Sequence, residues 1–194
     1  MILVLSLNIF IILATWETVR WTSDRFLLAR RVFWPSPLLV GGLLFYLTRA
    51  QFLVWSGTGL SGYLVPPYSN ISYFLQYSFF HFWASYVLSF LVGLLILKLA
   101  QYFNKKHGEK FFEKEEPYFI GLSVFLVGHP GWLAYLSLVL LTTFLFALGS
   151  WLSTKQVYRI AYYNLWLPLA IVAIVIDRFL IVYWPSYLIL VFAR

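Results

Sequence analysis

Apolar runs long enough to cross a membrane follow one another along most of the chain. Long runs cover residues 36–55, 74–100, 132–152 and 162–184, and a shorter one covers 1–16. An α-helix needs about 20 such residues to cross the hydrocarbon core of a bilayer. Of the 194 residues, 62% are hydrophobic and 11% are charged, whereas a soluble domain carries roughly 25% charged residues. The runs therefore predict an all-α integral membrane protein.

The predicted architecture is one polytopic helix bundle of about six transmembrane helices, formed by residues 1–194 as a single domain. We expect the first run to be a retained helix, because no cationic segment precedes it as in a secretion signal. The remaining segment, from Pro117 to residue 128, is short, so it tilts, stops within the bilayer or sits inside the bundle. Residues 56–73 hold glycines, a Pro-Pro pair and no charge. They predict a loop or cap and not a further span.

The distribution of Lys and Arg orients the bundle. The stretches 17–34, 101–116 and 153–161 carry most of these cations, and the opposite stretches 56–73 and 128–131 carry none. Cytoplasmic loops of membrane proteins carry an excess of Lys and Arg. The sequence therefore predicts that the N-terminus is outside. The net charge of +7 indicates contact with anionic lipid and not with nucleic acid.

Five ionisable residues fall at a similar depth in the outer half of the predicted bundle. They are Asp177 and Arg178, which are adjacent, and Arg49, His81 and His129. Charges inside a membrane segment are costly and mark functional sites. The pattern predicts a polar site, open to the outer leaflet, in which arginine forks bind the phosphate of an anionic phospholipid. If the site is catalytic, His129 is the base, Arg178 stabilises the leaving phosphate, and Asp177 holds an arginine or the histidine.

Each of these residues also has a purely structural explanation. Arg49 and Arg178 can extend to the headgroups, and Asp177 can form an ion pair, for which Arg49 is the nearest candidate in depth. His81 can hydrogen-bond a neighbouring helix, and His129 can lie in a surface turn. We nevertheless expect Arg178 to face protein or a cavity. The chain has no cysteine and no metal-ligand spacing, so no metal site and no cofactor are predicted.

Four stretches of the chain share features with one enzyme family: "VRWTSDRFLLARR" (19–31), "LLVGGLLFYL" (38–47), "GHPGWLAY" (128–135) and "DRFLIVYW" (177–184). They resemble the bacterial prolipoprotein diacylglyceryl transferases, which are inner-membrane enzymes. These enzymes move a diacylglyceryl group from phosphatidylglycerol to a lipoprotein cysteine at the outer face. The resemblance implies catalytic roles for His129 and Arg178 and a substrate-binding role for Tyr135. The chain has Leu43 where the family has arginine, and it lacks the family's Gly-Arg-x-Gly-Asn signature.

Two alternatives stay open. Residues 111–176 resemble the last third of the type IV prepilin peptidases, and Glu116 stands where their catalytic aspartate falls. That activity needs two carboxylates that share a proton, and no partner aspartate lies in the cytoplasmic half of any predicted helix. The second alternative is a non-catalytic assembly or scaffold subunit. In that case the aromatic residues, 22% of the chain, pack against a membrane-protein partner and the charges form structural pairs.

Overall fold

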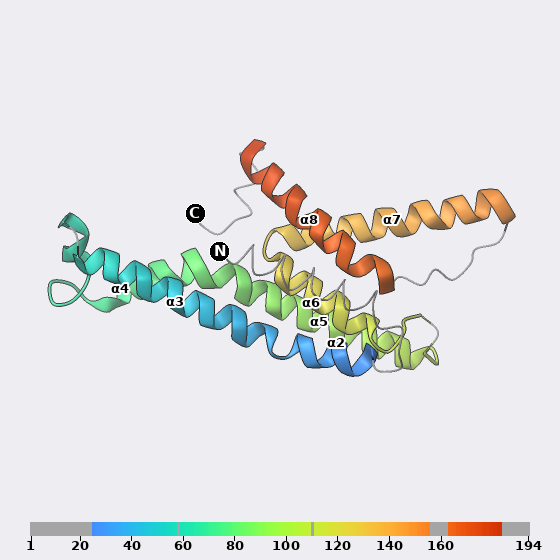
Figure 1. Cartoon of the computed structure of the whole chain (residues 1–194), viewed down its shortest axis with the longest axis horizontal. Coiled ribbons are helices and arrows are strands. Elements are labelled where there is room, and N and C mark those ends of the chain that lie inside the picture. The colour runs from blue at the N-terminus through green and yellow to red at the C-terminus, as the bar shows by residue number, and fades with distance from the viewer. Residues whose placement is uncertain (1–24, 58, 110, 156–162, 184–194) are drawn as a thin grey trace.

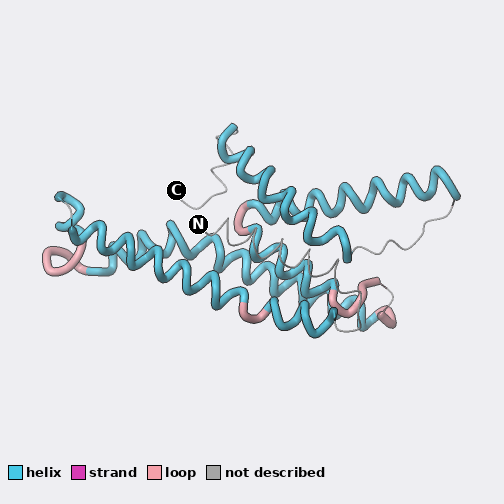
Figure 2. The backbone as a smooth tube through the Cα atoms, viewed as in Figure 1, coloured by secondary structure: helices cyan, strands magenta, loops and turns pink. Residues whose placement is uncertain are grey.

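The computed structural model describes residues 25–57, 59–109, 111–155 and 163–183. Every regular element among these residues is a helix, as predicted (Figure 2). The predicted first helix, 1–16, lies outside the described residues. The elements in chain order are α2 (Arg25–Phe33), α3 (Ser36–Gly57), η1 (Gly59–Leu64), α4 (Ile71–Ser78), the π-helix η2 (Phe79–Trp83), α5 (Ala84–Lys106), α6 (Glu116–Val127), α7 (Gly131–Thr154) and α8 (Tyr163–Tyr183).

Three helical stretches are long and apolar enough to cross a membrane. They are Ala29–Gly57, Ile71–Lys106 and Gly131–Ser153, and they contain the predicted runs 36–55, 74–100 and 132–152. Helix α8 corresponds to the predicted run 162–184. Several apolar helices of this length are what a multi-pass membrane protein requires.

Helix α6 sits inside the bundle, which was one of the three arrangements predicted for residues 117–128. It packs against α2, α5, α7 and α8 (Figure 1). Nearly every side chain from Glu116 to Leu126 is buried. Its 12 residues rise about 18 Å, which is less than the roughly 30 Å of a hydrocarbon core. Helix α6 is therefore an apolar core helix that is too short to cross the bilayer alone.

The contact between α5 and α6 is a backbone contact at two glycines. A Cβ built on Gly93 would lie 2.7 Å from the carbonyl oxygen of Gly121, and one on Gly121 would lie 3.0 Å from that of Gly93. Ser85 and Ser89 precede Gly93 at intervals of four residues on α5. Small residues at this spacing let membrane helices approach closely. The stripe brings the whole length of α6 against α5.

The connection between α3 and α4 is irregular, as predicted for residues 56–73. The 3-10 helix η1 is followed by a turn that contains Pro66 and Pro67. Asn70 then caps α4, because its Oδ1 accepts a hydrogen bond from the Ser72 amide at 3.1 Å. No continuous helix runs through the proline pair.

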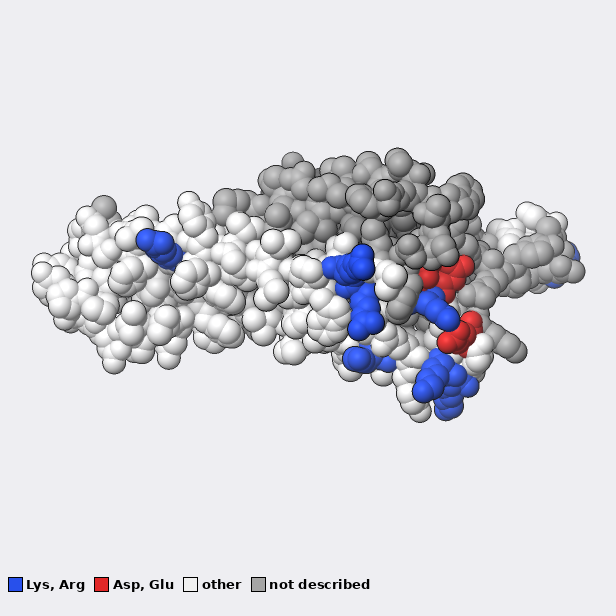
Figure 3. Space-filling view, turned by 60° about the horizontal axis from the view of Figure 1, so that its bottom comes forward, with Lys and Arg blue, Asp and Glu red and all other residues white. Residues whose placement is uncertain are grey.

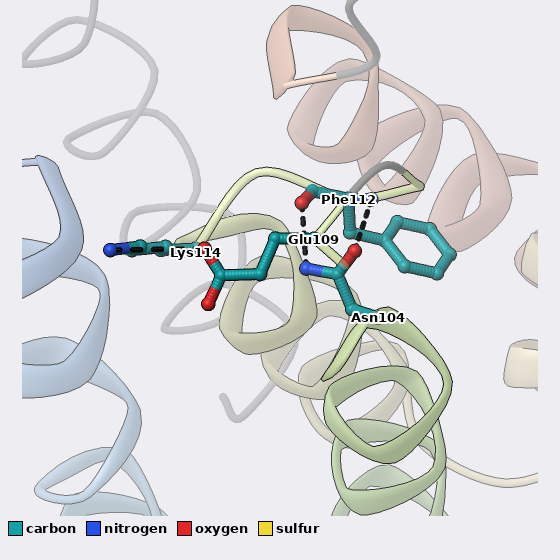
Figure 4. A network of polar contacts seen from close by, with 4 residues as sticks. All are labelled: Asn104, Glu109, Phe112 and Lys114. Carbon is teal, nitrogen blue, oxygen red and sulfur yellow. Dashed lines mark hydrogen bonds and ion pairs between the residues drawn. The ribbon is translucent and has the colours of Figure 1, made fainter. Parts of the chain in front are cut away.

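The connection between α5 and α6 is held by Asn104 (Figure 4). Its buried side chain donates from Nδ2 to the Phe112 carbonyl at 2.7 Å and accepts at Oδ1 from the amides of Phe111 and Phe112. Lys114 and Glu109 are 3.9 Å apart and exposed, so this ion pair contributes little to stability. One buried amide side chain therefore orders the loop.

Candidate functional site

The carboxyl group of Asp177 lies against the first turn of α7. A Cβ built on Gly131 would lie 3.1 Å from both Cγ and Oδ1 of Asp177. Gly131 is the first residue of α7 and follows the N-cap Pro130. The amides of Trp132 and Leu133 already donate to the carbonyls of Gly128 and Pro130, and the dipole of α7 favours a negative charge at this end of the helix. This environment explains how an apolar helix tolerates Asp177.

His129 is the central residue of the turn between α6 and α7. Its side chain is half-buried, and the flanking Gly128 and Pro130 are buried. Its carbonyl oxygen accepts a hydrogen bond of 2.6 Å from the Ser85 hydroxyl of α5. Residues 128–131 contact α5 through Ser85 and α8 through Asp177. The surface-turn alternative for the half-buried His129 side chain stays a prediction.

Tyr135 lies one turn after Gly131 on α7. Its side chain is completely buried, and its hydroxyl lies beside that of Ser123 on α6, which is also buried. The resemblance assigned Tyr135 to a substrate, but in this structure it is a core residue. Its substrate-binding role stays a prediction.

Arg49 is exposed on α3. The preceding Thr48 accepts a hydrogen bond of 3.0 Å from Nε1 of Trp83, which fixes the level of Arg49 at the start of α5. The sequence between residues 25 and 108 contains no Asp or Glu. No element from α2 to α5 therefore offers a carboxylate to the Arg49 guanidinium.

His81 is an exposed residue of the π-helix η2. Its ring stacks on that of Tyr77 with a centroid distance of 5.1 Å and an angle of 15° between the planes. Tyr77 in turn lies 4.8 Å from the ring of Trp55 on α3. Single π-helical turns within α-helices often occur at functional sites. The predicted aromatic surroundings of His81 are present, and the ring of Phe82 also contacts the imidazole at a centroid distance of 4.8 Å.

Asp177 and its neighbour Arg178 diverge. Asp177 is half-buried against α7. Arg178 is exposed, whereas we expected it to face protein or a cavity. Successive helical residues point about 100° apart. Because the Asp177 side chain is directed at α7, the Arg178 side chain points away from α7 and is exposed. Two exposed guanidinium groups, on Arg49 and Arg178, are the result.

Three contacts place these residues at a similar level. They join Thr48 to Trp83, Ser85 to the His129 carbonyl, and Gly131 to Asp177. We call residues 49, 81, 129, 177 and 178 the polar level. At about 1.5 Å of rise per residue, Ser85 lies about 20 Å from Lys98 along α5. The polar level is thus about two-thirds of a hydrocarbon core away from the cationic end of α5.

Comparison of the chain with protein-family models, with curated proteins and with solved structures gives no match. The roles of the residues are therefore argued from their placement alone. Sequence reasoning did not single out Ser85 or Gly131. Ser85 had a signal in the four-residue spacing of small residues on α5. Gly131 had none, because its contact with Asp177 depends on how α7 and α8 cross.

The buried Glu116 has a structural role at the start of α6. Its Oε2 accepts a hydrogen bond of 3.0 Å from the amide of Glu113. This is a helix-capping arrangement, in which a carboxylate near the N-terminus binds a preceding amide. This hydrogen bond accounts for the buried carboxylate of Glu116 without peptidase chemistry.

Proposed function

We propose that the chain is a bacterial inner-membrane protein whose polar level binds the phosphate of an anionic phospholipid, with phosphatidylglycerol as the candidate. The proposal includes about six membrane segments, an outside N-terminus and an opening of the polar level to the outer leaflet. The observation that carries it is the exposed Arg49 guanidinium, which has no carboxylate on α2 to α5.

The depth of Arg49 follows from the outer lobe, which we define as residues 50–80. The lobe has no charged residue. It exposes large apolar side chains, among them Leu53, Leu60 and Leu75, and Leu60 is 86% exposed. Burying one such side chain is worth about 1.5–3 kcal/mol, and an arginine at the bilayer centre costs about 2.5–3.5 kcal/mol on insertion scales. Several apolar side chains outweigh one arginine, so the bilayer covers the part of the lobe next to Arg49, and the guanidinium lies below the membrane surface.

An embedded guanidinium favours a phosphate partner. The level of Arg49 lies about 20 Å from Lys98 along α5, which is more than half of a roughly 30 Å hydrocarbon core. With Lys98 at the cytoplasmic boundary, Arg49 is therefore in the outer half of the bilayer. A lipid phosphate drawn to this level receives two parallel hydrogen bonds from one guanidinium fork. Arg178 supplies a second exposed fork at a similar level, and Asp177 fixes its helix against α7.

If the protein is also an enzyme, its resemblance to the diacylglyceryl transferases suggests the reaction that it catalyses. In that reaction a cysteine sulfur attacks a glycerol carbon, a C–S bond forms, and the C–O bond to phosphate breaks. His129 would take the thiol proton, and Arg178 would neutralise the charge on the leaving phosphate. Arg49 and His81 would bind the remaining headgroup.

A scaffold role is the second candidate, and helix α7 is the observation that favours it. Its C-terminal half diverges from the other helices (Figure 1) and exposes apolar side chains such as Phe144 and Trp151. A partner helix in the membrane would cover this surface, as would lipid.

The test is the phospholipid that co-purifies with the full-length protein, quantified by mass spectrometry. Arg49→Gln should lower bound phosphatidylglycerol roughly tenfold, because a hydrogen bond to a charged group is worth about 1.5–3 kcal/mol. Lys155→Gln is the matched control, since Lys155 lies at the far end of α7 with its ammonium 4.9 Å from the Trp151 ring. Equal lipid in both variants would remove the basis of the proposal.

A further inference from the structure

A second cationic surface lies at the opposite end of the bundle from the outer lobe. Figure 3 shows that most Lys and Arg side chains visible on one face gather over one half of it. We call five of the cations at this end the cationic collar, and all five are exposed. Its members are Arg30, Arg31, Lys98, Lys105 and Lys106.

The collar is drawn together by the packing of α2 and α5 on α6. The Cε2 atom of Phe33 lies 3.3 Å, and the Cβ atom of Leu97 3.2 Å, from a Cβ built on Gly121. Arg30 stands one turn before Phe33, and Lys98 directly follows Leu97. The two helices therefore present their cations at one level, and the end of α5 extends the surface.

The collar is not neutralised by the described part of the chain. None of its five members forms an ion pair with a described carboxylate, and the nearby Glu109 pairs with Lys114. The helix dipole favours cations in the last turns of α2 and α5. It does not explain Lys98, which stands two turns inside α5.

Exposed aromatic side chains surround the collar. Trp34 follows α2, Tyr102 and Phe103 lie between Lys98 and Lys105, and Phe111 is on the next loop; each is about half-exposed. Aromatic rings beside cations are typical of the membrane–water boundary. The collar therefore faces lipid headgroups and not open water.

We propose that the cationic collar binds the phosphates of anionic lipids in the leaflet opposite the polar level. Each Lys or Arg near an anionic membrane surface adds about 1 kcal/mol of attraction, a factor of roughly five in affinity. Two arginines within one turn of α2 and a lysine on α5 can hold one headgroup from two sides. This inference does not depend on the proposed function, because it concerns the other end of the bundle.

The test uses the full-length protein in nanodiscs that contain phosphatidylglycerol and phosphatidylcholine in equal amounts. The measurement is the ratio of the two lipids retained on the protein by native mass spectrometry. The triple variant Arg30→Gln, Arg31→Gln, Lys98→Gln should lower the ratio at least fivefold, by roughly a factor of five for each cation that contacts a phosphate. Raising the salt concentration should lower the wild-type ratio in the same direction.

Two controls keep the result specific. Lys98→Gln alone should lower the ratio by up to roughly fivefold, whereas Lys98→Arg keeps the charge and should keep the ratio, and this pair tests the proposal even if the triple variant folds poorly. Arg49→Gln should lower the amount of lipid bound at the polar level, and the lipid retained at the collar should stay as sensitive to salt as in the wild type. An unchanged ratio in the folded triple variant would overturn the proposal. Loss of a co-purified acidic protein from that variant, with the lipid ratio unchanged, would also overturn it.

Discussion

The Asp177 carboxyl lies so close to Gly131 that a side chain at position 131 requires Asp177 to shift. A Cβ there would lie 3.1 Å from the carboxyl and 2.9 Å from Cγ1 of Val127. Gly131→Ala should therefore lower the free energy of unfolding by about 1–3 kcal/mol, the usual cost of overpacking. Thermal unfolding in detergent measures this.

Gly149→Ala is the matched control for that substitution. Gly149 is also on α7, but nothing lies within 4 Å of its Cβ position. Alanine is favoured over glycine in a helix by up to about 1 kcal/mol, so this variant should be as stable as the wild type or more stable. Equal losses in the two variants would mean that the Asp177 contact is unimportant.

The glycine contact between α5 and α6 gives a second prediction. Gly93→Ala would place a methyl group 2.7 Å from the Gly121 carbonyl oxygen, and backbone cannot move aside as a side chain does. We expect a loss of about 2 kcal/mol or more, or failure to accumulate in the membrane. Gly42→Ala, with nothing near its Cβ position, should be tolerated. A fully stable Gly93→Ala protein would contradict this packing.

Ser85→Ala should loosen the turn that carries His129. It removes the 2.6 Å hydrogen bond to the His129 carbonyl, which is worth about 0.5–1.5 kcal/mol. The matched control is Ser137→Ala on the exposed face of α7, which should be neutral. Hydrogen exchange of residues 128–132 should rise in the first variant only, and a uniform response would argue against a local effect.

The orientation is testable with introduced cysteines, because the chain has none. Ser56 and Lys106 are both exposed, at the end of α3 and the end of α5. An impermeant thiol reagent should label Ser56→Cys in intact cells, and it should reach Lys106→Cys only after lysis. The reverse pattern would mean that the bundle is inverted.

The sequence predicted the helices well because their apolar runs are a property of local composition. The runs around α3, α5 and α7 were located to within a few residues, and Pro66-Pro67 marked the irregular connection. The split between Asp177 and Arg178 was harder to foresee, since it depends on which face of α8 meets α7. The burial of Tyr135 and of the 128–131 turn likewise follows from how α6 lies within the bundle, which no local pattern specifies.

We propose that the exposed arginines of the polar level bind a lipid phosphate, and the lipid that co-purifies with Arg178 variants tests this. Bound phosphatidylglycerol should fall in Arg178→Lys, because an ammonium lacks the bidentate fork, and should fall further in Arg178→Ala. A structural ion pair predicts instead that Arg178→Ala lowers thermal stability and that the double change Asp177→Ala with Arg178→Ala restores part of it. Such a recovery, with bound lipid unchanged in every variant, would contradict phosphate binding by Arg178.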